Sequence, residues 1–117
     1  MMLLDTHIWI WWVDGSARLS SHHKALLSQE EKNGLAVAAI SVWEVAKLVE
    51  KGKLELSLPV DQWIDQALAY PGINLTPEIA VRSTQLEGNF HADPADQLIV
   101  ATAQELAIPL LTMDARI

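Results

Sequence analysis

Short apolar runs alternate with longer, helix-like segments along the whole chain. The runs at 2–4 and 35–40 are bounded by polar or turn-forming residues and predict buried strands. Another run at 109–112 and a weaker one at 73–75 extend the series. No hairpin signal joins consecutive runs, which favours right-handed crossovers and a parallel sheet covered by helices. The pattern therefore predicts an α/β fold.

Helix start and stop signals lie between these runs. They predict one helix from Val42 to Gly52, one from Val60 to just before Pro71, and one from Pro77 to Gly88. A further helix opens at Pro94, and residues 20–32 add another. Since ligands of parallel sheets bind outside the carboxyl ends of the strands, candidate chemistry is expected where strands end and helices begin.

Composition narrows the class of protein. The chain has 117 residues, half of them apolar and 20% charged, which predicts one globular domain over 1–117. The absence of cysteine excludes disulfides and thiolate zinc sites and is compatible with the cytoplasm, which we expect. The longest apolar runs are six residues, far short of the roughly 20 that span a bilayer, and the N-terminus does not resemble a signal peptide.

Four acidic residues occupy the expected places: Asp5 after the first run, Glu44 and Asp96 near helix starts, and Asp114 after the last run. Each has a simpler explanation: Asp5 as an N-cap, Glu44 in a capping box with Ser41, and Asp114 in a turn. Together, however, converging carboxylates would repel one another unless a divalent cation lay among them. Oxygen ligands favour Mg²⁺ or Mn²⁺.

The segment Asp93-Pro94-Ala95-Asp96 is typical of a helix start, with Asp93 at the N-cap. Asp96 falls in line with the apolar positions of the following helix. The opposite side is expected to carry Gln97, Thr102, Gln104 and Glu105. A core-facing carboxylate needs compensation, so Asp96 is favoured as a metal ligand. Asp93 is favoured as the cap, with a peripheral place near the metal as the alternative.

Four motifs follow one another in the chain. They are Leu3-Leu4-Asp5-Thr6-His7, Ile40-Ser41-Val42-Trp43-Glu44-Val45-Ala46, His91-Ala92-Asp93-Pro94-Ala95-Asp96 and Leu111-Thr112-Met113-Asp114. In this order they resemble the PIN-domain nucleases, and within them the VapC-type toxins of type II toxin–antitoxin pairs. The resemblance implies a three-layer α/β/α domain with a central parallel sheet of four to five strands. Because the chain stops at Ile117, a domain without its C-terminal edge strand is one expectation.

The resemblance also implies an activity: a Mg²⁺-dependent endoribonuclease toxin that hydrolyses RNA and is neutralised by a cognate antitoxin. The resemblance implies that the acidic quartet of the active site consists of Asp5, Glu44, Asp96 and Asp114. Polar support for the quartet comes from Thr6, Ser41 and Thr112. We expect Asp5 and Asp96 to bind the principal ion. Glu44 would bind it or orient the attacking water, and Asp114 would bind through water or complete a second site.

Basic and aromatic residues leave alternatives open. The net charge of −7 opposes nonspecific RNA binding, although Lys47, Lys51 and Lys53 could follow an RNA backbone or simply be solvated. The apolar segment 8–13 has two interpretations. It forms a groove for an antitoxin or for a second protomer, and its apolar surface favours a homodimer. Alternatively, the predicted helices at 20–32 and 60–69 bury it within the chain. Trp43 and Trp63 are expected in the core.

The alternative function is a catalytically weak or inactive PIN-like protein-interaction module. It is motivated by Gln97 and by Met113-Asp114-Ala115, which lack the basic neighbours that similar domains carry. Other chemistries are poorly supported, because the histidines lack metalloprotease spacing and the chain contains no Gly-x-Ser-x-Gly elbow.

Overall fold

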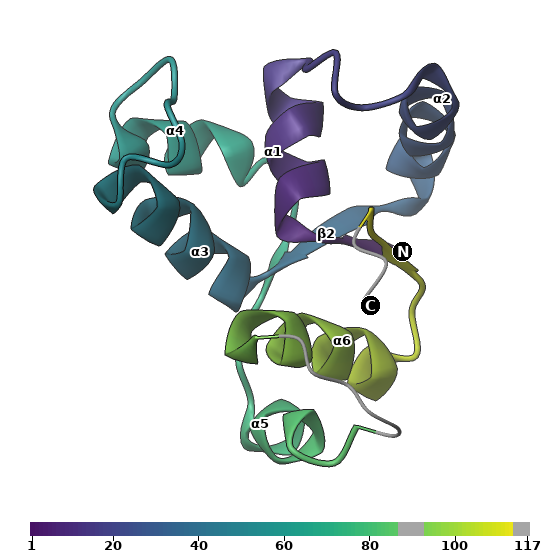
Figure 1. Ribbon diagram of the computed structural model, residues 1–117. Helices are drawn as coiled ribbons and strands as arrows, with labels where there is room; N and C mark the ends of the chain where they lie inside the picture. The colour runs from purple at the N-terminus through teal and green to yellow at the C-terminus, as the bar shows by residue number, and fades with distance from the viewer. Residues whose placement is uncertain (87–92, 114–117) are drawn as a thin grey trace.

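The computed structural model describes residues 1–86 and 93–113, and within them four strands form one parallel sheet (Figure 1). The strand order is β3-β2-β1-β4. The strands are β1 (Met2–Leu4), β2 (Leu35–Ala38), β3 (Gly72–Ile73) and β4 (Leu110–Leu111). Each strand pairs in parallel with its neighbours, which confirms the predicted α/β class.

The described helices lie on both sides of this sheet (Figure 1). They are α1 (Thr6–Asp14), α2 (Ser21–Glu30), α3 (Ala39–Glu50), α4 (Val60–Ala67), α5 (Pro77–Ser83) and α6 (Pro94–Leu106), and a 3₁₀ turn spans Glu31–Asn33. None of them is long and apolar enough to cross a membrane.

Strand pleating divides the core into two layers. Leu4 and Val37 point into a cluster with residues of α1 to α4, whereas Leu3 and Ala36 point to the opposite face, against α6. Successive side chains of a strand alternate between faces, so strands covered on both sides are apolar throughout, as here. The result is the predicted three-layer α/β/α arrangement.

Helix α3 begins three residues earlier than predicted, at Ala39 instead of Val42. Ser41 therefore lies inside the first turn of α3 and is fully buried, so the predicted capping box with Glu44 is wrong. The early start also shortens β2, which ends at Ala38 although the apolar run continues to Ile40. Helix α5 ends at Ser83 with Thr84 as its C-cap, so the prediction that this helix continues to Gly88 is wrong.

Helix α6 is covered on two sides, which its sequence periodicity did not indicate. Ile99 packs against the sheet, and α5 packs against another side of α6. Thr102, predicted to lie opposite the core, is buried, and its hydroxyl donates to the Leu98 carbonyl at 2.7 Å. The prediction that Thr102 lies on the side opposite the core is therefore wrong.

The tryptophan-rich helix α1 is largely buried within the chain. Trp9 is fully buried, its Nε1 donates to the Ala67 carbonyl at 3.2 Å, and its ring contacts that of Trp63 edge to face. Trp12 is half-buried and donates to the Tyr70 hydroxyl at 2.9 Å. Intramolecular burial therefore describes Ile8, Trp9 and Ile10, whereas Trp11 is also half-buried and Val13 is 36% exposed. Trp63 is in the core as predicted, but the same prediction is wrong for Trp43, which is 56% exposed.

Candidate metal centre

Asp5 stands at the carboxyl end of β1, and both of its carboxylate oxygens are held. Oδ1 accepts a hydrogen bond from the Thr6 amide at 2.7 Å, which makes Asp5 the N-cap of α1. Oδ2 accepts from the hydroxyl of Thr112, just after β4, at 2.6 Å. The neighbouring strands β1 and β4 thus fix one buried carboxylate at their common end.

Glu44 reaches the same edge of the sheet from α3. Its Oε1 accepts a hydrogen bond from the Thr6 hydroxyl at 2.6 Å, and the Thr6 hydroxyl oxygen also lies 2.8 Å from that of Ser41. A hydroxyl carries one proton. Since that of Thr6 is donated to Glu44, Ser41 donates to Thr6. Ser41 and Thr6 thus form a buried hydroxyl chain that orients Glu44.

Asp93 and Asp96 come from the first turn of α6. Asp93 is the N-cap, and its Oδ1 accepts from the Asp96 amide at 3.0 Å, with Pro94 in the first turn, as predicted. Asp96 is buried at 7% exposure, as its position in the helical pattern predicts, whereas Asp93 is exposed.

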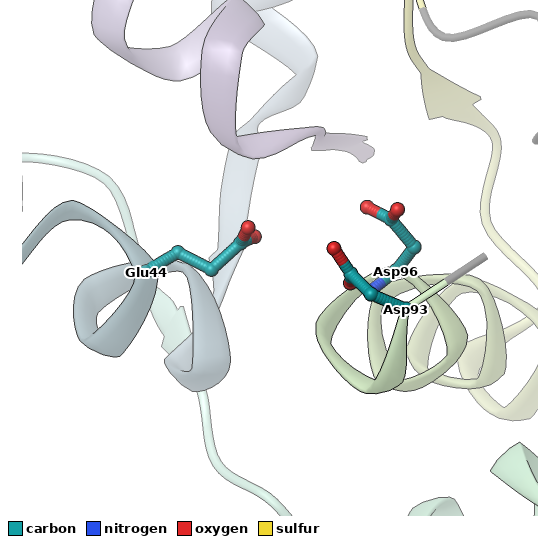
Figure 2. A group of neighbouring side chains, drawn as sticks. All are labelled: Glu44, Asp93 and Asp96. Carbon is teal, nitrogen blue, oxygen red and sulfur yellow. The ribbon is translucent and has the colours of Figure 1, made fainter. Parts of the chain in front are cut away.

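Three of these carboxylates converge. One oxygen each from Glu44, Asp93 and Asp96 lies within 4.8 Å of the other two, across the gap between α3 and α6 (Figure 2). Asp5 lines the same cleft, of about 360 Å³. We call this the acidic cleft; its described lining is Asp5, His7, Trp11, Arg18, Glu44, Asp93, Asp96 and Met113. An all-oxygen donor set of this kind fits a hard divalent cation such as Mg²⁺ or Mn²⁺.

The structure thus brings together Asp5, Glu44 and Asp96, and adds Asp93 to the cluster while keeping its cap. The remaining predicted acid, Asp114, lies outside the described residues, as does His91. Sequence reasoning missed Arg18. This residue follows α1 in a connection without a motif, so only the fold places it at the cleft.

Burial raises the pKa of the Glu44 carboxyl above its ordinary value. The hydrogen bond from Thr6 opposes this shift, while the negative charges of Asp93 and Asp5 add to the pKa increase. The acidic cleft therefore disfavours the ionised form of the Glu44 carboxyl. A cation among the carboxylates would instead favour the ionised form.

A second cleft of about 260 Å³ adjoins the first, since Glu44 and Asp93 line both. We call it the lysine cleft; its other described lining residues are Trp43, Lys47, Leu48, Lys51, Lys53, Pro94 and Ala95. The three lysines considered for RNA contact therefore lie around one hollow beside the acidic cluster.

This parallel α/β/α domain carries clustered carboxylates at the carboxyl ends of its strands. The chain belongs to the PIN-domain family, whose model matches residues 2–117. The chain is 39% identical over 117 residues to Ribonuclease VapC22 from Mycobacterium tuberculosis (strain ATCC 25618 / H37Rv), covering 99% of this chain and 88% of that protein. The predicted family resemblance is thereby confirmed.

Two solved structures share the fold. A toxin–antitoxin complex from Klebsiella pneumoniae is 22% identical with a TM-score of 0.67, covering 97% of this chain and 87% of the matched one. VapBC2 from Rickettsia felis, bound to a DNA fragment from its promoter, is 18% identical with the same TM-score and the same coverage.

Proposed function

We propose that this protein is a Mg²⁺- or Mn²⁺-dependent endoribonuclease that acts as the toxin of a toxin–antitoxin pair and hydrolyses RNA phosphodiester bonds. The observation that carries the proposal is the convergence of carboxylate oxygens from α3 and α6 beside Asp5. Family membership, and the ribonuclease to which the chain is 39% identical, support RNA as the substrate class.

In this proposal Asp5 and Asp96 bind the principal ion, and Glu44 binds it or orients the attacking water. Asp114 contributes through water or at a second site. Asp93 lies close enough to Glu44 and Asp96 to contribute an oxygen while it caps α6. A bound divalent ion supplies Lewis acidity toward a phosphate oxygen and toward water.

The protein's own contribution is to hold the carboxylates in place before a ligand arrives. Thr112 fixes Asp5, and the Ser41–Thr6 chain fixes Glu44. Each carboxylate oxygen can accept two hydrogen bonds or ligands, so these contacts leave acceptor positions for a cation. Such hydrogen-bonded partners orient ligands and typically matter about 10- to 100-fold for metal affinity.

A cognate antitoxin is the proposed protein partner, supported by solved relatives described as a toxin–antitoxin complex and as VapBC2. A homodimer stays a prediction. Size-exclusion chromatography with light scattering checks it, and a monomeric mass across micromolar concentrations would contradict it.

The central test incubates purified protein with structured RNAs and Mg²⁺. We expect cleavage that EDTA, Asp5→Asn or Asp96→Asn abolishes. Asp61→Asn provides a matched control, because Asp61 is an exposed aspartate on α4 that lines neither cleft. Cleavage that survives both EDTA and the cleft substitutions would discard the carboxylate mechanism, and no cleavage of any RNA would favour the inactive interaction module.

A further inference from the structure

Trp43 is a large aromatic side chain that the packing of the described residues does not use. Its side chain is 56% exposed, whereas Trp9 and Trp63 are buried, and it belongs to neither core cluster. Val45, two residues along α3, is the fully buried residue that fixes this helix against the core. An exposed indole in a cleft offers a flat apolar face for contact with a ligand.

Positive charge surrounds this indole. Trp43 and Lys47 are four residues apart and lie along one side of α3, and Lys51, the C-cap of α3, lines the same cleft. Lys53 lines the same cleft. The lysine cleft therefore holds three of the chain's eight Lys and Arg residues. Lys47 pairs with Glu50 at 2.7 Å, while Lys51 and Lys53 form no ion pair within the described part of the chain. In a chain of net charge −7, these lysines concentrate cationic side chains at one cleft, which Glu44 and Asp93 also line.

The lysine cleft is also continuous with the acidic cleft through Glu44 and Asp93. A polymer with one phosphate at the carboxylate cluster therefore has its adjoining unit in the lysine cleft. The lysine cleft has a volume of about 260 Å³.

We infer that the lysine cleft is the subsite for the nucleotide next to the scissile phosphate, with its base stacked on Trp43 and the adjoining phosphates contacting Lys51 and Lys53. This inference rests on the proposed function. Aromatic platforms beside cationic side chains are the usual means of holding single-stranded nucleic acid. The lysines favour phosphates and the indole favours a flat base, and a nucleotide supplies both groups together.

Stacking needs an unpaired base and tolerates all four bases. The subsite therefore selects an unpaired nucleotide, not a particular letter. This preference distinguishes it from a patch of lysines alone, which would contact phosphates of paired and unpaired RNA alike.

The test measures binding of a short single-stranded RNA by fluorescence anisotropy with Mg²⁺, in the Asp96→Asn background to prevent cleavage. We expect Trp43→Ala to raise Kd about 5- to 150-fold, which corresponds to the loss of one stacked base. Trp43→Leu keeps apolar area without the π face and should behave like alanine, whereas Trp43→Phe should retain most of the affinity. The matched control is Val81→Ala, since Val81 is also 56% exposed but lines neither of these clefts.

A second arm uses oligonucleotides with a single abasic unit at each position in turn. We expect one position of the oligonucleotide at which an abasic unit weakens binding to the protein that keeps Trp43. The same abasic unit should not weaken binding to the Trp43→Ala variant. Replacing Lys51 and Lys53 by alanine should lower the slope of log K against log salt concentration by about 0.7 for each phosphate contact that is lost. Lys32→Ala should leave this slope unchanged, because Lys32 is an exposed lysine outside both clefts.

The outcomes separate the two proposals. If RNA binds but neither Trp43→Ala, nor Trp43→Leu, nor any abasic unit weakens binding, the subsite is wrong and the proposed function stands. Loss of antitoxin binding on Trp43→Ala with RNA affinity unchanged would reassign the cleft to a protein interface and also overturn the subsite. If the unsubstituted protein neither binds nor cleaves any RNA, the proposed function itself is wrong. Circular dichroism melting verifies that each variant is folded.

Discussion

Replacing Glu44 by glutamine should stabilise the metal-free protein while abolishing cleavage. The substitution keeps the size of the side chain and an oxygen that accepts from the Thr6 hydroxyl, but it removes a charge that the site disfavours. Burial raises the pKa of Glu44 above its ordinary value of 4.5, so the folded protein binds this proton more tightly than the unfolded chain. As pH rises past the unfolded pKa and then the folded one, stability is progressively lost, and the full penalty remains at neutral pH.

The magnitude follows from the nearest named charge. An oxygen of Glu44 lies within 4.8 Å of one from Asp93. Coulomb's law at that separation gives about 0.9 kcal/mol at the dielectric constant of water and about 3.5 kcal/mol at an effective value near 20. Because Glu44 is only half-buried, we expect Glu44→Gln to raise the free energy of unfolding by about 1–2 kcal/mol, or several degrees in Tm.

The assay is thermal unfolding by circular dichroism at low salt with EDTA, at pH 7 and below the ordinary glutamate pKa. The gain should be present at pH 7 and absent at low pH, where Glu44 is protonated in both states. Glu50→Gln on the same helix is the matched control. Its hydrogen bond and ion pair with Lys47 lower the pKa of Glu50, so removing that charge should give no gain. A Glu44→Gln protein less stable than the parent at pH 7 in EDTA would refute this reasoning.

Three further predictions concern the same fold. Thr112→Val removes the hydroxyl that donates to Asp5 and should weaken Mn²⁺ binding about 10-fold by calorimetric titration; an unchanged Kd would show that this bond does not orient the ligand. Acidification from pH 7 to pH 4 should release the metal, because the raised pKa of Glu44 makes it take up a proton early, and equal affinity at both pH values would contradict this. Ala107 ends α6 with φ of 54°, a left-handed conformation, so Ala107→Gly should add about 0.5–1 kcal/mol in urea unfolding, and a loss would count against strain there.

Periodicity and turn chemistry predicted most of the fold. The strand at 2–4, the helix opening at Pro94 and its cap Asp93 are local features, determined by side chains within a few residues of one another. The burial of Asp96 also follows from local helical geometry. Boundaries were less predictable: Ser41 has the chemistry of an N-cap, yet α3 starts at Ala39, and Ser41 instead lies in the first turn with its hydroxyl against that of Thr6.

Contacts between distant segments were beyond local reasoning. Thr102 is buried although it lies opposite the apolar positions of α6, and Trp43 is exposed although tryptophan usually lies inside. Arg18 reaches the acidic cleft from a connection without a motif.

The sequence by itself determined the residue types, namely several acids at strand ends and helix starts and hydroxyl side chains beside them, because those positions follow from local pattern. Only the tertiary structure decided which acids meet. Asp93 joins Glu44 and Asp96 because α3 and α6 approach each other from opposite faces of the sheet, and the distance between two helices depends on the packing of all the layers between them.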